Sequence, residues 1–434
     1  MRCCVVSQPG GCHVLADSVA GPRLGRLCRS WLLGSLVCML MPAGSARAAC
    51  SSTATWPAWD AFKQQFISAD GRVIDPFGPR KTTTSEGQAY SLFFALVAND
   101  RAAFELALRW TENNLAAGDL RSRLPAWQWG QRDDGSWNVL DSNAASDADL
   151  WIVYALNEAS RLWNQPRYGS LAIALADRVL SEETTELNGL GRVLLPGPQG
   201  FGPWTHAGIV RAKVNPSYLP LPVLRSLADG SAGQRDAWRA VLATAIRALD
   251  EGAPRGLAAD WLLAQASSPA VPAGWLPDDG SSRSDVPEGV AFNTDGAATG
   301  SYNAIRVYMW LGLTDEGDPA RRALVERYAP MADLTAQRGT PPEVVDLIGT
   351  RHEGSGPPGF SAALLPYLDA LGRPDTARQQ SQRLVSDPLR ADAYYEQSLA
   401  LFALGHREGF FRFDAEGHLL PRWNTCAARP VSAR

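Results

Sequence analysis

The chain has 434 residues, of which 45% are hydrophobic and 20% are charged, and its formal net charge is −4. A chain of this length can bury a large core. The acidic balance argues against nucleic acid as a partner, because phosphate binding needs clustered lysine and arginine. The balance suits a neutral polymer, and with 15 tryptophans we expect some indole rings to serve as surface platforms.

The N-terminal segment is typical of an export signal. Three arginines precede the apolar run 31–41, and an A-x-A cleavage pattern ends at Ala48. The apolar run is too short to serve as a permanent membrane anchor, which is the alternative interpretation. The sequence therefore predicts a signal peptide over 1–48 that is removed on export. A single catalytic domain over 49–434 would then remain, in the periplasm or secreted.

Seven cysteines are present, and five of them lie within the predicted signal peptide. The other two, Cys50 and Cys426, stand near the two ends of the mature chain. Two cysteines in an exported protein usually pair, so we expect a disulfide that joins these ends. A lipid anchor on Cys50 is the alternative, but the preceding ARAA lacks the leucine of a lipobox.

The mature chain is predicted to form twelve helical segments joined by loops rich in glycine and proline. Six are amphipathic and are expected on the outside: 57–68, 101–115, 167–183, 234–252, 318–337 and 373–387. Six are poorer in charge and are expected to be buried: 85–99, 146–163, 216–229, 301–313, 359–372 and 392–405. Their strict alternation predicts an all-α (α/α)6 barrel, with an open helical array as the alternative. We expect neither βαβ units nor a strand-rich stretch.

Polar and aromatic residues gather at the N-terminal ends of the inner segments. The inner helices of such a barrel run parallel, so these ends should meet at one face and form a cleft. The residues are Ser85 and Glu86, Asp147 and Asp149, Ser217 and Tyr218, Tyr302, Asn303 and Arg306, and Tyr394 and Tyr395.

Two of these ends carry carboxylates that could act in catalysis. Glu86 stands in the first turn of a helix that continues as core, and partial burial would raise its pKa as a general acid requires. The alternative role for Glu86 is a simple interaction with the helix dipole. Asp147 and Asp149 are two residues apart and cannot face the same way on a helix. We expect one to face the cleft while the other caps; capping by both is the alternative.

Aromatic residues and missing motifs narrow the chemistry. Trp127, Trp129 and Trp137 occur in a polar loop, where indole rings stack on sugars or pack under loops. The chain has no HExxH, paired CxxC, GxSxG or phosphate-loop motif, and its five histidines are scattered. We therefore expect no metal and no cofactor. Two carboxylates and many aromatic residues in a helical barrel favour glycoside hydrolysis.

Four stretches make the family resemblance specific. TSEGQAY, ASDADLWIVYALNEASRLW, NPSYLP and SYNAIRVYMW resemble glycoside hydrolase family 8, with ASDAD as its signature. TWPAWDAF, GRVIDP, LPAWQWG and GFSAALLP further resemble the periplasmic endoglucanases that accompany bacterial cellulose synthase. The resemblance covers about Cys50 to Cys426. It implies an inverting endo-1,4-β-glucanase on an (α/α)6 barrel, acting on cellulose chains, with the synthase complex as a partner. Xylan, mixed-linkage glucan and chitosan stay open as substrates.

The resemblance also implies roles for individual residues. Glu86 matches the general acid of the family, and Asp147 matches the signature aspartate, which acts as nucleophile or as a ligand of the distorted sugar. Tyr218, Tyr302 and Arg306 match cleft residues around that sugar. Trp127 or Trp129 matches a stacking platform.

Asn303 departs from the family pattern. It stands where many members carry the aspartate that activates water, near the start of a helix that we expect Gly300 and Ser301 to cap. An amide cannot accept a proton at neutral pH, so Asn303 cannot be that base. Three explanations stay open: a substitute carboxylate, a weak enzyme that only positions water, or a non-hydrolytic glucan binder. The substitutes are Asp147 and, in the loop 276–298, Asp285, Glu288 and Asp295.

Overall fold

The computed structural model describes residues 55–77, 80–206, 209–266, 268–273, 298–347 and 351–424. The chain divides into two compact units, Met1–Ala49 and Cys50–Arg434, and every described residue belongs to the second. The predicted signal peptide, both cysteines of the expected disulfide and the three loop carboxylates lie outside the described residues. Among the residues that are described, no helix has both the length and the apolar character needed to cross a membrane.

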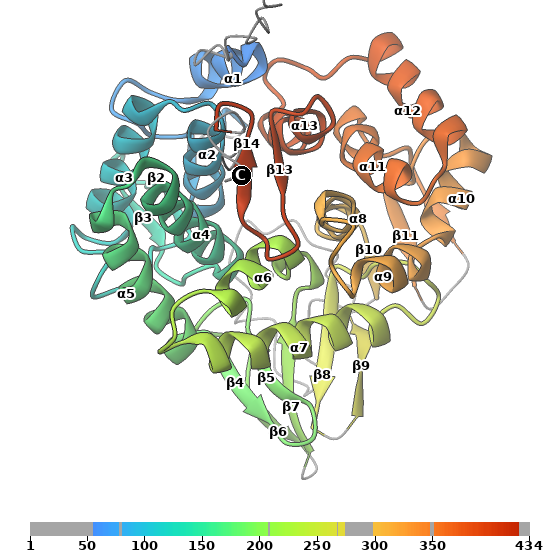
Figure 1. Ribbon diagram of the computed structural model, residues 1–434, viewed down its shortest axis with the longest axis horizontal. Coiled ribbons are helices and arrows are strands. Elements are labelled where there is room, and N and C mark those ends of the chain that lie inside the picture. Colours follow the sequence, from blue (N-terminus) through green and yellow to red (C-terminus); the bar gives the residue numbers. More distant parts are fainter. Residues whose placement is uncertain are drawn as a thin grey trace, which may run out of the picture. The chain divides into compact units, whose positions relative to one another are not determined.

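The predicted alternation of outer and inner helices is confirmed, and the fold is an (α/α)6 barrel. Figure 1 shows the helices of this unit following one another around a ring in chain order. The outer helices are α1 (Pro57–Phe66), α3 (Arg101–Leu115), α5 (Pro166–Glu182), α7 (Arg235–Glu251), α9 (Arg321–Arg327), α10 (Pro330–Arg338) and α12 (Pro374–Ser386). The inner helices are α2 (Ser85–Val97), α4 (Ser146–Trp163), α6 (Leu221–Asp229), α8 (Ala304–Leu313), α11 (Pro358–Ala370) and α13 (Tyr394–Arg407).

Proline divides two of the predicted segments. The outer segment 318–337 becomes α9 and α10 because Pro330, the first residue of α10, has no backbone N–H for a continuous helix. The inner segment 216–229 begins as the short 3₁₀ helix η1 (Pro216–Tyr218), and α6 follows Pro220. The second break leaves Tyr218 outside the regular helix, on the connection that leads into it.

A cluster of aromatic rings fills the centre of the barrel and joins helices that are distant in the sequence. Phe402 of α13 lies 4.6 Å from Phe94 of α2 between ring centroids, so the last inner helix contacts the first. Phe402 also lies 5.0 Å from Trp151 of α4 and 5.0 Å from Trp310 of α8. All four rings are buried. Burial of several such rings fixes the inner helices against one another.

The expectation that the chain has no strand-rich stretch is wrong. One four-stranded antiparallel sheet joins β6 (Trp204–His206), β7 (Ile209–Val214), β8 (Trp261–Gln265) and β9 (Ser268–Ala273). The other described strands are β1 (Thr83–Thr84), β2 (Gln128–Gln131), β3 (Trp137–Asp141), β4 (Thr184–Leu187), β5 (Gly191–Leu194), β10 (Thr299–Gly300), β11 (Val344–Asp346), β12 (His352–Glu353), β13 (Phe411–Phe413) and β14 (Leu419–Pro421). These strands are two to six residues long, too short for alternation to stand out in sequence.

The predicted start of the helix at 301–313 is also wrong. Residues 299 and 300 form β10, which pairs with β11, and α8 begins only at Ala304. Asn303 is the N-cap residue, but its side chain makes no capping bond. The free N–H groups of this end are instead bound by Asp260, a carboxylate from a distant segment.

Candidate active site

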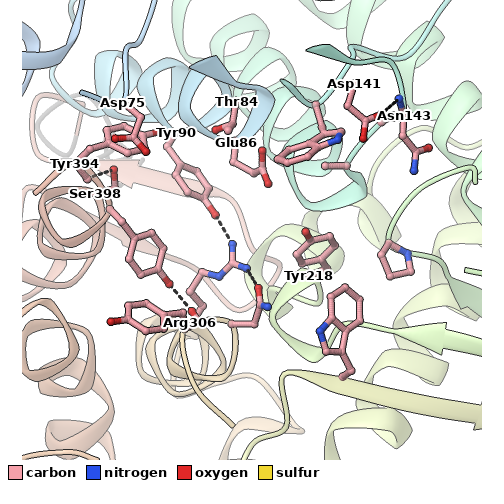
Figure 2. A pocket seen from close by; sticks show the side chains of 18 of the residues that line it. Asp75, Thr84, Glu86, Tyr90, Asp141, Asn143, Tyr218, Arg306, Tyr394 and Ser398 are labelled. Atoms are coloured by element: carbon pink, nitrogen blue, oxygen red, sulfur yellow. Dashed lines mark hydrogen bonds between the residues drawn. The ribbon is translucent and has the colours of Figure 1, made fainter. Parts of the chain in front are cut away.

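A cavity of about 320 Å³ opens where the N-terminal ends of the inner helices meet. Figure 2 shows side chains of α2, η1, α8 and α13 directed into it. The predicted convergence of these ends is therefore confirmed. The cavity-lining residues are Asp75, Thr84, Glu86, Tyr90, Trp127, Asp141, Asn143, Ala144, Ala145, Pro196, Phe201, Tyr218, Trp261, Tyr302, Asn303, Arg306, Tyr394, Tyr395 and Ser398.

Glu86 enters the cavity from the first turn of α2. The helix is capped locally, because the Thr84 hydroxyl accepts the N–H of Gly87 at 3.2 Å. Glu86 is thus not needed as the cap, and its carboxyl group lines the cavity. Burial, together with the nearby charge of Asp147, raises the pKa of Glu86 to about 8. A carboxyl group with this pKa keeps its proton at neutral pH and can donate it.

Arg306 connects three walls of the cavity. Its Nη1 donates to Asp147 Oδ2 at 3.0 Å and to the Tyr90 hydroxyl at 3.2 Å, and its Nη2 donates to Asn303 Oδ1 at 2.6 Å. The guanidinium carbon lies 5.5 Å from the centroid of the Tyr218 ring. The side chains of Arg306 and Asp147 are only 8% and 2% exposed. Water therefore screens the pair little, and each buried charge is stabilised mainly by the other.

Asp147 is a buried partner of Arg306 rather than the cap of α4. Its Oδ1 accepts the N–H of Ala148 at 2.9 Å, and α4 has no side-chain cap at its N-cap residue Ala145. Burial raises the pKa of Asp147, and the Arg306 guanidinium opposes that rise. Asp147 does not line the cavity itself but reaches it through Arg306.

Asp149 and Glu183 form a second carboxyl pair behind Asp147. Both side chains are completely buried, and no donor within the described part of the chain contacts their four oxygens. Burial raises the pKa of both groups well above the usual range, and the two carboxyl groups lie within hydrogen-bonding reach of each other. Two adjacent buried carboxylates would repel, so the pair retains a proton. The expectation that either Asp147 or Asp149 caps α4 is wrong.

Asn303 faces the cavity as a hydrogen-bond donor. Its side-chain oxygen is engaged by Arg306, and its Nδ2 has no partner among the described residues although the residue is only 6% exposed. The amide can therefore donate to a substrate hydroxyl or a water molecule, but it cannot take a proton from one.

Asp260 holds the end of α8 and was not foreseen from the sequence. Its Oδ1 accepts the backbone N–H groups of Ser301, Asn303 and Ala304 at 2.9, 3.0 and 2.9 Å. Burial raises the pKa of Asp260 to about 6, although these three N–H groups oppose the rise. Nothing in the local sequence distinguishes this aspartate, because the helix that it caps begins more than 40 residues later.

The predicted aromatic residues divide between the cavity and its surroundings. Trp127, Tyr218 and Tyr302 line the cavity, and the Tyr302 hydroxyl donates to Glu343 Oε1 at 2.9 Å. Trp129 does not line it; its ring packs against Trp110 at 5.3 Å between centroids.

Two further carboxylates line the cavity besides Glu86. In Figure 2, Asp75 and Asp141 lie along the same side as Glu86, whereas Arg306 lies across from them. Burial raises the pKa of Asp75. Among the described residues that line the cavity, the side facing Glu86, with Arg306, Asn303 and Tyr218, includes no carboxylate; Asp147 stands behind it, paired with Arg306. Nor does the described structure contain a cluster of His, Cys, Asp and Glu that could hold a metal ion.

Comparisons with known proteins show which family the chain is similar to. The family model for glycosyl hydrolases family 8 matches residues 34–409. An endoglucanase of Salmonella typhi is 42% identical over 397 residues, covering 92% of this chain and 97% of its own. An endoglucanase of Xanthomonas axonopodis pv. citri is 43% identical over 402 residues, covering 90% and 96%. The crystal structure of an endo-1,4-D-glucanase from Vibrio fischeri ES114 superposes with a TM-score of 0.73 at 36% identity, covering 85% of this chain and 99% of that one.

Proposed function

This chain belongs to the glycosyl hydrolases of family 8, and from that membership we propose that it is an inverting endo-1,4-β-glucanase. The observation that carries the proposal is the half-buried Glu86 carboxyl group, whose pKa is raised to about 8, in a cavity with aromatic walls that also holds Arg306, the partner of Asp147. The names of the similar proteins support a β-1,4-glucan as substrate, since they are endoglucanases and an endo-1,4-D-glucanase.

Glu86 acts as the general acid in this proposal. Its raised pKa leaves the proton on the carboxyl group at neutral pH, and in the reaction it passes to the leaving glycosidic oxygen. Arg306 binds the distorted sugar next to Glu86, and Asp147 holds the Arg306 guanidinium in place from behind the cavity wall. Trp127 supports a neighbouring sugar ring from the cavity wall.

The water on the opposite face of the sugar is positioned rather than deprotonated by the wall that faces Glu86. Asn303 offers only its amide N–H groups, and both oxygens of Asp147 are already bound, one of them by a guanidinium. Asn303 and Asp147 are therefore both poor bases. A substitute carboxylate is the competing explanation, and Asp285, Glu288 and Asp295 are its candidates outside the described residues. The expected reaction is hydrolysis that Asn303 slows.

The biological setting that we propose is export and action on nascent cellulose. The predicted signal peptide and the resemblance to endoglucanases of cellulose synthesis support a periplasmic or secreted enzyme whose partner is the cellulose synthase complex. A glucan-binding partner of the synthase with little or no hydrolysis is the second candidate, and Asn303 in the place of the usual base is the observation that favours it.

One substitution tests the proposed reaction. Glu86→Gln should lower the release of reducing ends from carboxymethylcellulose by roughly 10²- to 10⁴-fold, the typical contribution of a general acid. The variant should still bind cellopentaose in calorimetry, which shows that the cleft is intact. Undiminished hydrolysis would refute Glu86 as the acid. Binding by the wild type with no hydrolysis in long incubations would support the glucan-binding candidate.

A further inference from the structure

An exposed indole ring stands beside the cavity on the β2–β3 hairpin. Trp137 of β3 is 42% exposed and stacks on Trp129, with 5.4 Å between ring centroids and 23° between the ring planes. The guanidinium of Arg72 lies 4.4 Å from the Trp129 centroid and 4.8 Å from the Trp137 centroid. We call Trp129, Trp137 and Arg72 together the outer stack.

The outer stack is held rigidly. Arg72 Nε donates to the Thr83 hydroxyl at 2.8 Å, and its Nη2 donates to the Lys81 carbonyl. Trp110 packs edge-on against Trp129 from α3. A ring fixed in this way loses little conformational freedom when a ligand covers its free surface, so binding there costs little ordering.

The outer stack is continuous with the cavity through the backbone of the hairpin. Trp127 lines the cavity, and Trp129 follows it by two residues, about 6.7 Å along an extended strand. On the partner strand, Asp141 lines the cavity and Trp137 lies four residues away, about 13 Å along the strand. The indoles at 127, 129 and 137 therefore follow one another along the hairpin, past an irregularity between Gln128 and Trp129, from Trp127 in the cavity to the exposed ring of Trp137.

We propose that Trp137 is an outer sugar-binding platform, on which a β-1,4-glucan chain rests after it leaves the cavity past Asp141. The proposal rests on the proposed glucanase function, since it extends the same cleft. The apolar face of a pyranose ring can pack on a flat indole. A second platform outside the cavity favours long chains, because a short oligosaccharide that fills the cavity does not reach it.

The test compares a short and a long substrate. Trp137→Ala should raise KM for carboxymethylcellulose roughly fivefold, which is the size of one aromatic contact, with kcat little changed. A contact made equally in ground state and transition state alters KM alone. Hydrolysis of cellotriose should be unaffected. Trp137→Phe keeps a ring at this position and should restore most of the affinity, whereas a purely structural role would not depend on substrate length.

Ile173→Ala provides the matched control, because Ile173 is 44% exposed and lies on the outer helix α5. It should leave both substrates unchanged. Retardation of each variant in gels containing carboxymethylcellulose gives a readout that needs no turnover. If Trp137→Ala matches the wild type in gels and in KM, the outer platform is overturned while the glucanase function stands. If the wild type neither cleaves nor is retarded, both proposals are overturned.

Discussion

The two walls of the cavity are built in different ways. The acid wall, Thr84 and Glu86 at the start of α2, is capped by its own sequence, since Thr84 accepts an N–H three residues ahead. The facing wall, Asn303 and Arg306 at the start of α8, is held by Asp260 from a segment more than 40 residues away. A local cap needs only residues within its own turn of the helix. The facing wall exists only when β10, Asp260 and α8 are assembled together.

Of the substitutions considered, removal of Arg306 should have the largest effect on stability and activity. Arg306→Ala leaves the buried Asp147 carboxylate unpaired, and we expect a loss of about 3–5 kcal/mol in the free energy of unfolding, measured by urea denaturation, together with loss of hydrolysis. Arg225→Ala is the control, because Arg225 pairs with the buried Asp318 at 2.9 Å away from the cavity. It should destabilise the fold yet leave the folded enzyme active. Equal loss of activity in both variants would argue against a specific role for Arg306 in the site.

A carboxylate at position 303 should make the facing wall complete. Asn303→Asp places a base next to Arg306, and we expect kcat on carboxymethylcellulose to rise by roughly 10²-fold, within the range of general base catalysis. Steady-state kinetics at neutral pH measure the change, with Glu86→Gln in the same background as the control for the acid. An unchanged kcat would assign the water-activating role to a carboxylate elsewhere in the chain.

The acid wall should set the alkaline limit of activity. Glu86 works as an acid only while protonated, and its pKa of about 8 lies above the usual value, so activity is retained below that pH and lost above it. We expect kcat/KM to fall about tenfold for each pH unit above this pKa. A pH profile on carboxymethylcellulose checks the result. Activity that starts to fall near pH 5 would show that Glu86 titrates like an ordinary carboxyl group.

The two caps can be compared directly by substitution. Asp260→Ala removes the acceptor of three N–H groups, of which two are buried, and we expect a loss of about 3 kcal/mol in the free energy of unfolding. Thr84→Ala removes one capping bond, and we expect about 1 kcal/mol. Urea unfolding measures both. Similar losses would mean that the distant cap of α8 stabilises the fold no more than the local cap of α2.

Much of the fold follows from patterns that are local in the sequence. The apolar periodicity of 85–99 or 146–163 is contained within each segment, so the inner and outer helices are predictable one at a time. Glu86, Asp147 and Arg306 are recognisable because they stand at helix starts in family motifs. The sheet of β6 to β9 was missed, because its strands are short and because β7 and β8 pair across the long connection that holds η1, α6 and α7.

The sequence by itself determined the alternating helices, the family and some of the residues that line the cavity from inner-helix starts, such as Glu86 and Arg306, because the patterns that identify them lie within short stretches of the chain. Only the tertiary structure decided that Asp260 caps α8, that Glu183 faces Asp149, and that Trp129 lies in the outer stack rather than in the cavity. Each of these depends on segments brought together across the barrel, and burial then sets the pKa values on which the proposed chemistry depends.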